Sequence, residues 1–199
     1  MEIYFLKGKI EFNMRIISGK FKGTTLFTLS GDNTRPTLDR VKESLFNILS
    51  NIFYDTFVLD LFAGSGALGL EAVSRGASFC DFVDVSNEAV NIINKNIDKC
   101  HTKEVTKVHK SDFETAINKF PDNRFDLVFL DPPYGRNMGI LAINKLDRIV
   151  KKTGIIILET DSTDEVPDNI GNFTKYDSRQ YGRVVISFFR KAGFIDGGT

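Results

Sequence analysis

Cysteine and histidine are scarce in this chain of 199 residues, which has two of each: Cys80, Cys100, His101 and His109. Two cysteines cannot build a disulfide framework, and Cys100–His101 lacks the further soft ligands of a closed zinc site. We therefore expect no bound metal, and the low cysteine content is typical of the reducing cytoplasm.

Long hydrophobic runs are also missing. No apolar stretch approaches the roughly 20 residues that a membrane helix needs. Met1–Asn13 carries Lys7, Lys9 and Glu11 and has no small-residue cleavage site, so we do not expect a signal peptide. These features predict a cytoplasmic protein without a membrane partner.

An excess of charge of either sign is absent, since 26 basic and 26 acidic residues give a net charge of zero. This balance excludes a histone-like protein that binds polyanions by bulk charge, but it allows a local basic face. Residues 14–42 hold six basic and two acidic side chains, and residues 175–191 hold five and one, so each segment has a balance of +4. Such patches favour contact with a defined RNA surface.

Hydrophobic periodicity divides the chain into two parts. Residues 15–29 alternate loosely and predict a β-hairpin, and apolar residues from Leu38 to Ile52 recur at helical spacing after Thr37, a candidate N-cap. From Phe57 onward, strands alternate with helices. The predicted strands are 57–62, 78–83, 105–109, 125–130, 154–159 and 184–189, and the predicted helices are 67–75, 86–97, 113–120 and 140–150. Repeated β-α-β units predict an α/β fold with a mainly parallel sheet and helices on both faces.

A glycine-rich turn follows the first of these strands. Gly64, Gly66 and Gly69 have G-x-G-x-x-G spacing between a strand and a helix, and Asp84 ends the next strand. Glycine allows the backbone to approach a ligand closely, and a carboxylate at the position of Asp84 accepts hydrogen bonds from ribose hydroxyls. The pattern predicts a nucleotide-like ligand.

Asp60 narrows the choice of ligand because it precedes the glycines within an apolar strand. A carboxylate there would repel the pyrophosphate of a dinucleotide but would attract a cationic amino-acid group. S-adenosylmethionine has an ammonium and a sulfonium and no phosphate, so it is the cofactor that we expect.

Asp112 and Phe113 follow the third strand of this series. Asp112 is a candidate acceptor for the amino group of adenine, and Phe113 is a candidate to face the adenine ring. Asp112 also precedes a helix and suits an N-cap, and the two roles are compatible. Together with Asp60 and Asp84, it lies at the carboxyl edge of the sheet, where open α/β sheets bind ligands.

The most specific motif is Asp131-Pro132-Pro133-Tyr134, directly after the strand 125–130. The prolines rigidify the turn, so that a carboxylate and a backbone carbonyl offer two acceptors to one amino group. Tyr134 provides a ring that stacks on a flat heterocycle. This combination favours methyl transfer to an exocyclic amine, because the two acceptors help the nitrogen to direct its lone pair at a methyl group.

The chain resembles the RsmD family of bacterial 16S rRNA (guanine-N2)-methyltransferases. The motifs 60–69 and 131–134 resemble class I S-adenosylmethionine-dependent methyltransferases, and the segments Met14–Gly23 and Thr34–Asn47 resemble the RsmD family in particular. The resemblance covers residues 14–190. It implies a Rossmann-like class I methyltransferase fold with a seven-stranded sheet, an antiparallel last hairpin and a small N-terminal β element that holds RNA.

The resemblance also implies roles for individual residues. Asp131, Pro132 and Tyr134 would hold the guanine. The implied cofactor-binding set is Asp60, Phe62, Ala63, Gly64, Gly66, Asp84, Asp112 and Phe113, and the implied RNA-binding set is Arg15, Lys20, Lys22, Arg35 and Arg40. The partner would be small-subunit rRNA or an assembling 30S subunit, and we expect a monomer.

Four parts are expected on this basis. Residues 1–13 are an N-terminal extension or a misassigned start, 14–54 an RNA-contacting hairpin and helix, 55–192 the methyltransferase domain, and 193–199 a tail. Three alternatives stay open: an amino-group methyltransferase acting on adenine N6 or cytosine N4 of DNA or on protein glutamine, a nicotinamide-dependent oxidoreductase, and a non-catalytic RNA-binding module.

Overall fold

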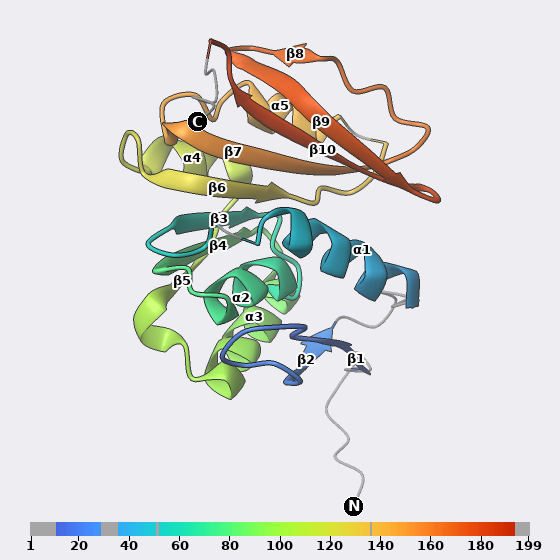
Figure 1. Cartoon of the computed structure of the whole chain (residues 1–199). Helices are drawn as coiled ribbons and strands as arrows, with labels where there is room; N and C mark the ends of the chain where they lie inside the picture. The colour runs from blue at the N-terminus through green and yellow to red at the C-terminus, as the bar shows by residue number, and fades with distance from the viewer. Residues whose placement is uncertain (1–10, 29–35, 51, 136, 194–199) are drawn as a thin grey trace, which may run out of the picture.

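The structure, a computed structural model, describes residues 11–28, 36–50, 52–135 and 137–193 (Figure 1). A large sheet carries helices on both faces, and a small hairpin packs beside it. The strands are β1 Glu11–Arg15, β2 Thr25–Thr28, β3 Phe57–Leu61, β4 Phe79–Asp84, β5 Thr106–Lys110, β6 Phe125–Leu130, β7 Val150–Asp161, β8 Asn169–Ile170, β9 Phe173–Tyr181 and β10 Val184–Lys191. The helices are α1 Pro36–Ile48, α2 Ala67–Ser74, α3 Asn87–Cys100, α4 Phe113–Lys119 and α5 Met138–Ile143, with a 3₁₀ turn at Lys103–Val105.

The strand order of the large sheet is β5-β4-β3-β6-β7-β10-β9-β8. Strands β3 to β7 are parallel to one another, whereas β10 is antiparallel to both β7 and β9. The expected mainly parallel sheet with an antiparallel last hairpin is therefore confirmed. The sheet has eight strands in place of the seven expected, because the two-residue strand β8 pairs with β9 at the edge.

Two expected elements have different bounds. The helix expected at 140–150 ends at Ile143, and Val150 already belongs to β7, where it pairs with Phe125. Leu146, Ile149 and Val150 are all buried, so their apolar character reflects burial in a turn and a strand and not a helix face. The residues between Ile143 and Val150 thus show that periodicity alone does not separate helix from strand.

The N-terminal part also differs in detail. The hairpin consists of β1 and β2, so its first strand begins at Glu11, inside the segment expected as an extension, and residues 16–24 form the connection. Helix α1 begins at Pro36, so Thr37 lies within the helix and not at its N-cap. The division into RNA-contacting and methyltransferase parts stays a prediction.

The core has one apolar cluster on each face of the sheet. Helices α1, α2 and α3 contribute to the first cluster, together with Ile16 and Leu26 of the hairpin segment, and α4 and α5 contribute to the second. Adjacent residues of β7 alternate between them, because Ile155 and Ile157 join the first and Ile156 and Leu158 the second. The N-terminal block therefore shares its core with the sheet. Within the residues described, no helix is long and apolar enough to cross a membrane.

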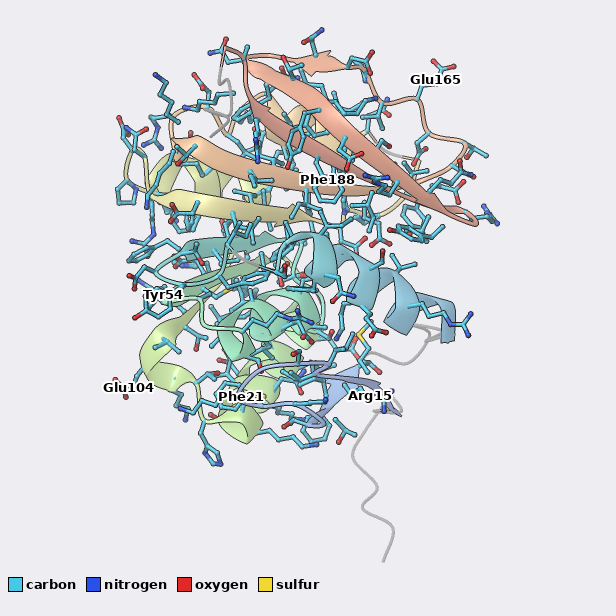
Figure 2. All side chains as sticks on the ribbon, in the orientation of Figure 1. Arg15, Phe21, Tyr54, Glu104, Glu165 and Phe188 are labelled. Atoms are coloured by element: carbon cyan, nitrogen blue, oxygen red, sulfur yellow. The ribbon has the colours of Figure 1, made fainter. Side chains whose placement is uncertain are left out.

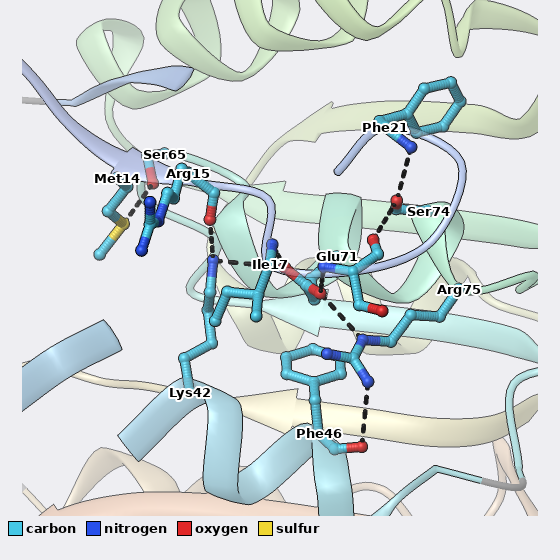
Figure 3. A network of polar contacts seen from close by, with 12 residues as sticks. Met14, Arg15, Ile17, Phe21, Lys42, Phe46, Ser65, Glu71, Ser74 and Arg75 are labelled. Atoms are coloured by element: carbon cyan, nitrogen blue, oxygen red, sulfur yellow. Dashed lines mark hydrogen bonds and ion pairs between the residues drawn. The ribbon is translucent and has the colours of Figure 1, made fainter. Parts of the chain in front are cut away.

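A buried carboxylate holds the N-terminal block against the sheet (Figure 3). Glu71 of α2 has no exposed surface and accepts hydrogen bonds from the backbone N–H groups of Ile17 (2.7 Å) and Ser18 (3.0 Å). Arg75 Nε donates to it at 2.8 Å, and Lys42 Nζ of α1 lies 3.4 Å away. One side chain thus connects the hairpin, α1 and α2.

Further bonds around Glu71 strengthen this junction. Lys42 Nζ donates to the carbonyl of Arg15 at 2.6 Å, and the guanidinium of Arg75 lies 4.9 Å from the ring centre of Phe46. Ser74 Oγ donates to the carbonyl of Ser18 at 2.6 Å. The residues that follow β1 are therefore fixed through side chains of α1 and α2.

Replacing Glu71 by glutamine tests this junction. Glu71→Gln puts an amide NH₂ among backbone N–H groups and two cations, so we expect a loss of about 3 kcal/mol in the free energy of unfolding. Urea denaturation measures the loss. Glu104→Gln, at an exposed carboxylate of the 3₁₀ turn Lys103–Val105 (Figure 2), is the control and should change the value by less than about 0.5 kcal/mol. Equal effects of the two substitutions would contradict the role assigned to Glu71.

Candidate functional site

A cavity of about 750 Å³ opens at the carboxyl edge of the parallel strands. Its wall comes from the ends of β3, β4, β5, β6 and β7 and from one side of α1. The size is typical of sites for small molecules and cofactors. Five acidic side chains line it, namely Asp60, Asp84, Asp112, Asp131 and Glu159. The strand-end acids expected from the sequence therefore meet at one site.

The glycine turn between β3 and α2 forms the floor of the site. Gly66 is the N-cap of α2 and has φ +78°, a conformation that glycine adopts without strain. Gly69 lies in the first turn of α2, where an added Cβ would come within 2.3 Å of the Phe82 ring. These two glycines allow α2 to begin directly at the end of β3 and to pack closely on β4.

Asp60 is buried at the end of β3, with 2% of its surface exposed. Its Oδ2 accepts a hydrogen bond from the N–H of Gly69 at 2.9 Å. Burial raises the pKa of Asp60 from 3.8 to about 7; the Gly69 bond opposes this shift, and the charge of Asp84 adds to it. A cationic ligand group beside Asp60 would stabilise the ionised carboxylate, so the position suits an ammonium.

Asp84, at the end of β4, is held by the backbone. Its Oδ2 accepts from the N–H of Gly64 at 2.9 Å and its Oδ1 from the N–H of Ser86 at 2.8 Å. Each carboxylate oxygen has a second lone pair, so Asp84 can still accept from ligand hydroxyls. The bond to Gly64 also joins this acid to the glycine turn.

Another part of the cavity wall contains Asp112 and two phenylalanines, Phe62 and Phe113. Asp112 is the N-cap of α4 and accepts from the N–H of Thr115 at 2.8 Å, which holds the pKa of the carboxyl below its usual range. The rings of Phe62 and Phe113 lie 5.5 Å apart. Phe62 has φ +81°, an uncommon value for a bulky residue that indicates a locally strained backbone. The two rings give the cavity an apolar side suited to a flat heterocycle.

The turn Asp131–Tyr134 stands on the other side of the cavity. Asp131 is exposed, Pro132 is buried, and Tyr134 is 49% exposed. The Tyr134 hydroxyl donates to Glu159 Oε1 at 2.9 Å. Burial and the neighbouring carboxylates of Glu159 and Asp131 raise the pKa of the Tyr134 hydroxyl far above its usual value, so Tyr134 stays a neutral donor.

The structure brings together nearly all of the expected ligand-binding residues. The catalytic candidates Asp131, Pro132 and Tyr134 line the cavity, as do the cofactor candidates Asp60, Phe62, Ala63, Gly64, Asp84, Asp112 and Phe113. Gly66 is not part of the lining and acts as the helix N-cap instead. Each assigned role stays a proposal.

The expected RNA-binding residues surround the cavity at different distances. Arg15 and Arg40 are exposed and adjoin the lining residues Met14 and Val41 (Figure 2 shows Arg15 on the hairpin). Lys20 and Lys22 are exposed on the connection that packs on the last residue of α2, about 12 Å along that helix from the glycine turn. Arg35 lies outside the described residues.

Two charged lining residues were not expected as site residues. Glu159 directly follows the apolar run Ile155–Leu158 of β7, so the rule that singled out the other strand-end acids would have found it. Lys42 also lines the cavity but is 7% exposed, and no sequence pattern separates it from the surface cations nearby.

The basic segment 175–191 is not a free cationic patch. Ion pairs join Lys175 to Asp168, Arg179 to Asp177, Arg183 to Asp161 and Lys191 to Asp147, all within 3.1 Å. The balance of +4 counted only acids inside the segment, whereas three of these four partners lie outside it. The charge argument for RNA contact therefore applies to the exposed N-terminal residues Arg15, Lys20, Lys22 and Arg40, and not to Lys42, which is buried beside Glu71.

Comparisons with known proteins agree with this geometry. The sequence profile of the family described as Conserved hypothetical protein 95 matches residues 14–190. The chain is 35% identical to YlbH of Bacillus subtilis, provisionally named an rRNA methyltransferase, over 90% of this chain and 100% of that one. It is 38% identical to Ribosomal RNA small subunit methyltransferase D of Haemophilus influenzae over 74% of this chain and 79% of that protein.

A solved structure supports the same relationship. The Escherichia coli protein yhhF, provisionally named a methyltransferase, superposes with a TM-score of 0.76 at 28% identity, covering 89% of this chain and 97% of that one. The expected Rossmann-like class I methyltransferase fold is thereby confirmed.

The raised pKa of Asp60 predicts a pH-dependent effect of its removal. Because the pKa is higher in the folded chain than in the unfolded one, ionising Asp60 lowers the free energy of unfolding as the pH rises from about 4 to about 7. Asp60→Asn removes this cost and keeps an acceptor for Gly69. We expect it to be more stable than the unsubstituted protein at about pH 8, by the order of a few kcal/mol, and equally stable near pH 4.

Urea denaturation at the two pH values measures this effect. Glu165→Gln, at an exposed carboxylate, is the control and should show no such pH dependence. If Asp60→Asn changed stability equally at both pH values, the assignment of a raised pKa would be wrong.

Proposed function

The chain belongs to the RsmD family, described as Conserved hypothetical protein 95, and we propose that it is an rRNA methyltransferase that uses S-adenosylmethionine to methylate the exocyclic N2 amine of a guanine in small-subunit rRNA. The observation that carries the proposal is that the turn Asp131–Tyr134 faces the same cavity as Asp60, Asp84 and Asp112. The acids proposed to bind the cofactor, here called the cofactor cradle (Asp60, Asp84 and Asp112), and the turn proposed to hold the amine thus line one cavity.

The residues of the cradle suit S-adenosylmethionine. Buried Asp60 accepts one backbone hydrogen bond, so it can also face an ammonium. Asp84 is oriented by two backbone N–H groups to meet ribose hydroxyls, and Phe113 offers an apolar ring for adenine. Lys42 is the one cation among the described lining residues, and it is engaged by Glu71 and the Arg15 carbonyl. The acid-rich lining disfavours the pyrophosphate of a nicotinamide dinucleotide.

The turn Asp131–Tyr134 acts on the nucleobase. The carboxylate of Asp131 and the carbonyl of Pro132 accept the two N–H bonds of N2, which directs the nitrogen lone pair at the methyl group. When bound, S-adenosylmethionine would supply that methyl on its sulfonium. The N2 nitrogen would bond to the methyl carbon in line with the breaking carbon–sulfur bond, so that S-adenosylhomocysteine leaves, and the Asp131 carboxylate would take the proton that N2 gives up. Positioning and exclusion of water are the main contributions.

Removing the Asp131 carboxylate tests the proposal. Asp131→Ala should lower turnover about a hundredfold or more, because the amine loses its charged acceptor, while the affinity for S-adenosylhomocysteine stays within about twofold. Turnover is measured with radiolabelled S-adenosylmethionine and small ribosomal subunits that lack the modification, followed by digestion of the RNA to nucleosides. We expect the label in N2-methylguanosine.

The outcomes separate the alternatives. Label in N6-methyladenosine or N4-methylcytidine would keep the amine-holding turn and reject the guanine target. Near-normal turnover by Asp131→Ala would reject its role. Absence of label, with S-adenosylhomocysteine bound, would reject this substrate.

The surface charge near the cavity gives a second test. Arg40 is exposed on α1, next to lining residue Val41, so Arg40→Ala should weaken rRNA binding uniformly and lower the slope of log K against log salt by about 1. Lys95→Ala, at an exposed lysine of α3, is the control. Filter binding over a range of salt concentrations measures both slopes. Identical slopes would remove Arg40 from the RNA surface.

A further inference from the structure

Glu159 stands beside Asp131 at the edge of the sheet. Strands β6 and β7 are parallel neighbours, and Leu130 pairs with Leu158. Asp131 and Glu159 each follow a paired residue, so their backbones are at the same level on strands that lie about 4.8 Å apart. Both side chains line the cavity. The pairing therefore places two carboxylates next to each other where the target base is held.

The carboxylate of Glu159 has capacity for another donor. Its Oε1 accepts from the Tyr134 hydroxyl at 2.9 Å, and no described residue donates to Oε2. The side chain is half-buried, and burial raises the pKa of the carboxyl. A half-buried carboxylate without a cationic partner gains most from a donor that the ligand brings.

Guanine brings such a donor next to its amine. On its Watson–Crick edge, N1–H is adjacent to the N2 amino group, so the edge presents donors side by side. Adenine and cytosine have a ring nitrogen lone pair next to their amine, at N1 and N3. An acceptor that holds only the amine cannot tell these bases apart, whereas a second acceptor beside it can.

We propose that Glu159 accepts the N1–H of the target guanine while Asp131 holds the N2 amine, and that Glu159 thereby selects guanine over adenine and cytosine. The inference rests on the proposed function and assigns the base specificity to a residue of β7. The carboxylate attracts N1–H of guanine and repels the ring lone pair of the other two bases. Specificity thus comes from both an attractive and a repulsive contact.

A purely structural role would consist of orienting Tyr134 through the hydroxyl bond. The two roles predict different effects of a Glu159 substitution on the methylation of the base analogue 2-aminopurine relative to guanine. This analogue keeps the 2-amino group but has a lone pair at N1 in place of N1–H. A residue that contacts N1 changes the preference for guanine over 2-aminopurine, whereas a residue that only orients Tyr134 changes both activities alike.

The experiment compares two substrates and three proteins. The guanine that the unsubstituted protein methylates in rRNA is first located. A substrate RNA is then prepared by ligation with either guanine or 2-aminopurine at that position. The proteins are unsubstituted, Glu159→Gln and Tyr134→Phe. Tyr134→Phe is the matched variant because it removes the hydroxyl bond and leaves the Glu159 carboxylate in place.

We expect Glu159→Gln to lower kcat/KM for guanine by roughly 10- to 100-fold, the size of a lost specific contact to a base edge. Its amide NH₂ can donate to N1 of 2-aminopurine, so the guanine preference should fall at least about tenfold. Tyr134→Phe should keep the preference of the unsubstituted protein. The preference is a ratio within one preparation, so a partial loss of folded protein cancels.

The outcomes test the role of Glu159 separately from the proposed function. An unchanged preference in Glu159→Gln, with N2-methylguanosine still formed by the unsubstituted protein, would overturn the role of Glu159 and leave the proposed function intact. Equal loss of preference in both variants would assign the effect to Tyr134 and overturn the inference. Failure of the unsubstituted protein to methylate any rRNA guanine would overturn the proposed function and the inference with it.

Discussion

The buried carboxylate of Glu71 is the contact on which the arrangement of the site depends. It receives two backbone N–H groups from the segment after β1 and faces two cations from α1 and α2. Leaving any of these groups unpaired in the interior would be costly, so the hairpin segment, α1 and α2 stabilise one another through this carboxylate. The same Lys42 that faces Glu71 also lines the cavity, so the network that stabilises the N-terminal block also shapes one wall of the site.

The five acids of the cavity stand in different environments, and this difference gives them different chemistry. Asp60 is buried and its pKa is raised to about 7, so it responds strongly to a cationic ligand. Asp84 and Asp112 are oriented by backbone N–H groups. Asp131 is exposed at the mouth and Glu159 is half-buried beside it. The charge of Asp84 adds to the raised pKa of Asp60, so a ligand that brings a cation and several donors would stabilise this set of acids.

The hairpin is also connected to the glycine turn. Asn96 of α3 has no exposed surface, and its Nδ2 donates both to the Phe27 carbonyl of β2 and to the Ser65 carbonyl between the two glycines. A single amide therefore links the N-terminal element to the floor of the cofactor cradle. Packing and polar contacts make the small hairpin part of the site's framework.

Most of the fold and the candidate site follow from the sequence alone. Apolar strand patterns, the glycine spacing and acids at strand ends are local signals, and the rule that parallel strands share one carboxyl edge brings Asp60, Asp84, Asp112 and Asp131 together. The neighbours of each side chain could be identified only from the tertiary structure, because strand order and register are set by contacts between distant segments. Only the pairing of Leu130 with Leu158 places Glu159 beside Asp131, and only burial separates Lys42 from the surface cations around it. Likewise, Lys175 and Arg183 are neutralised by acids that adjoin them only in the folded chain.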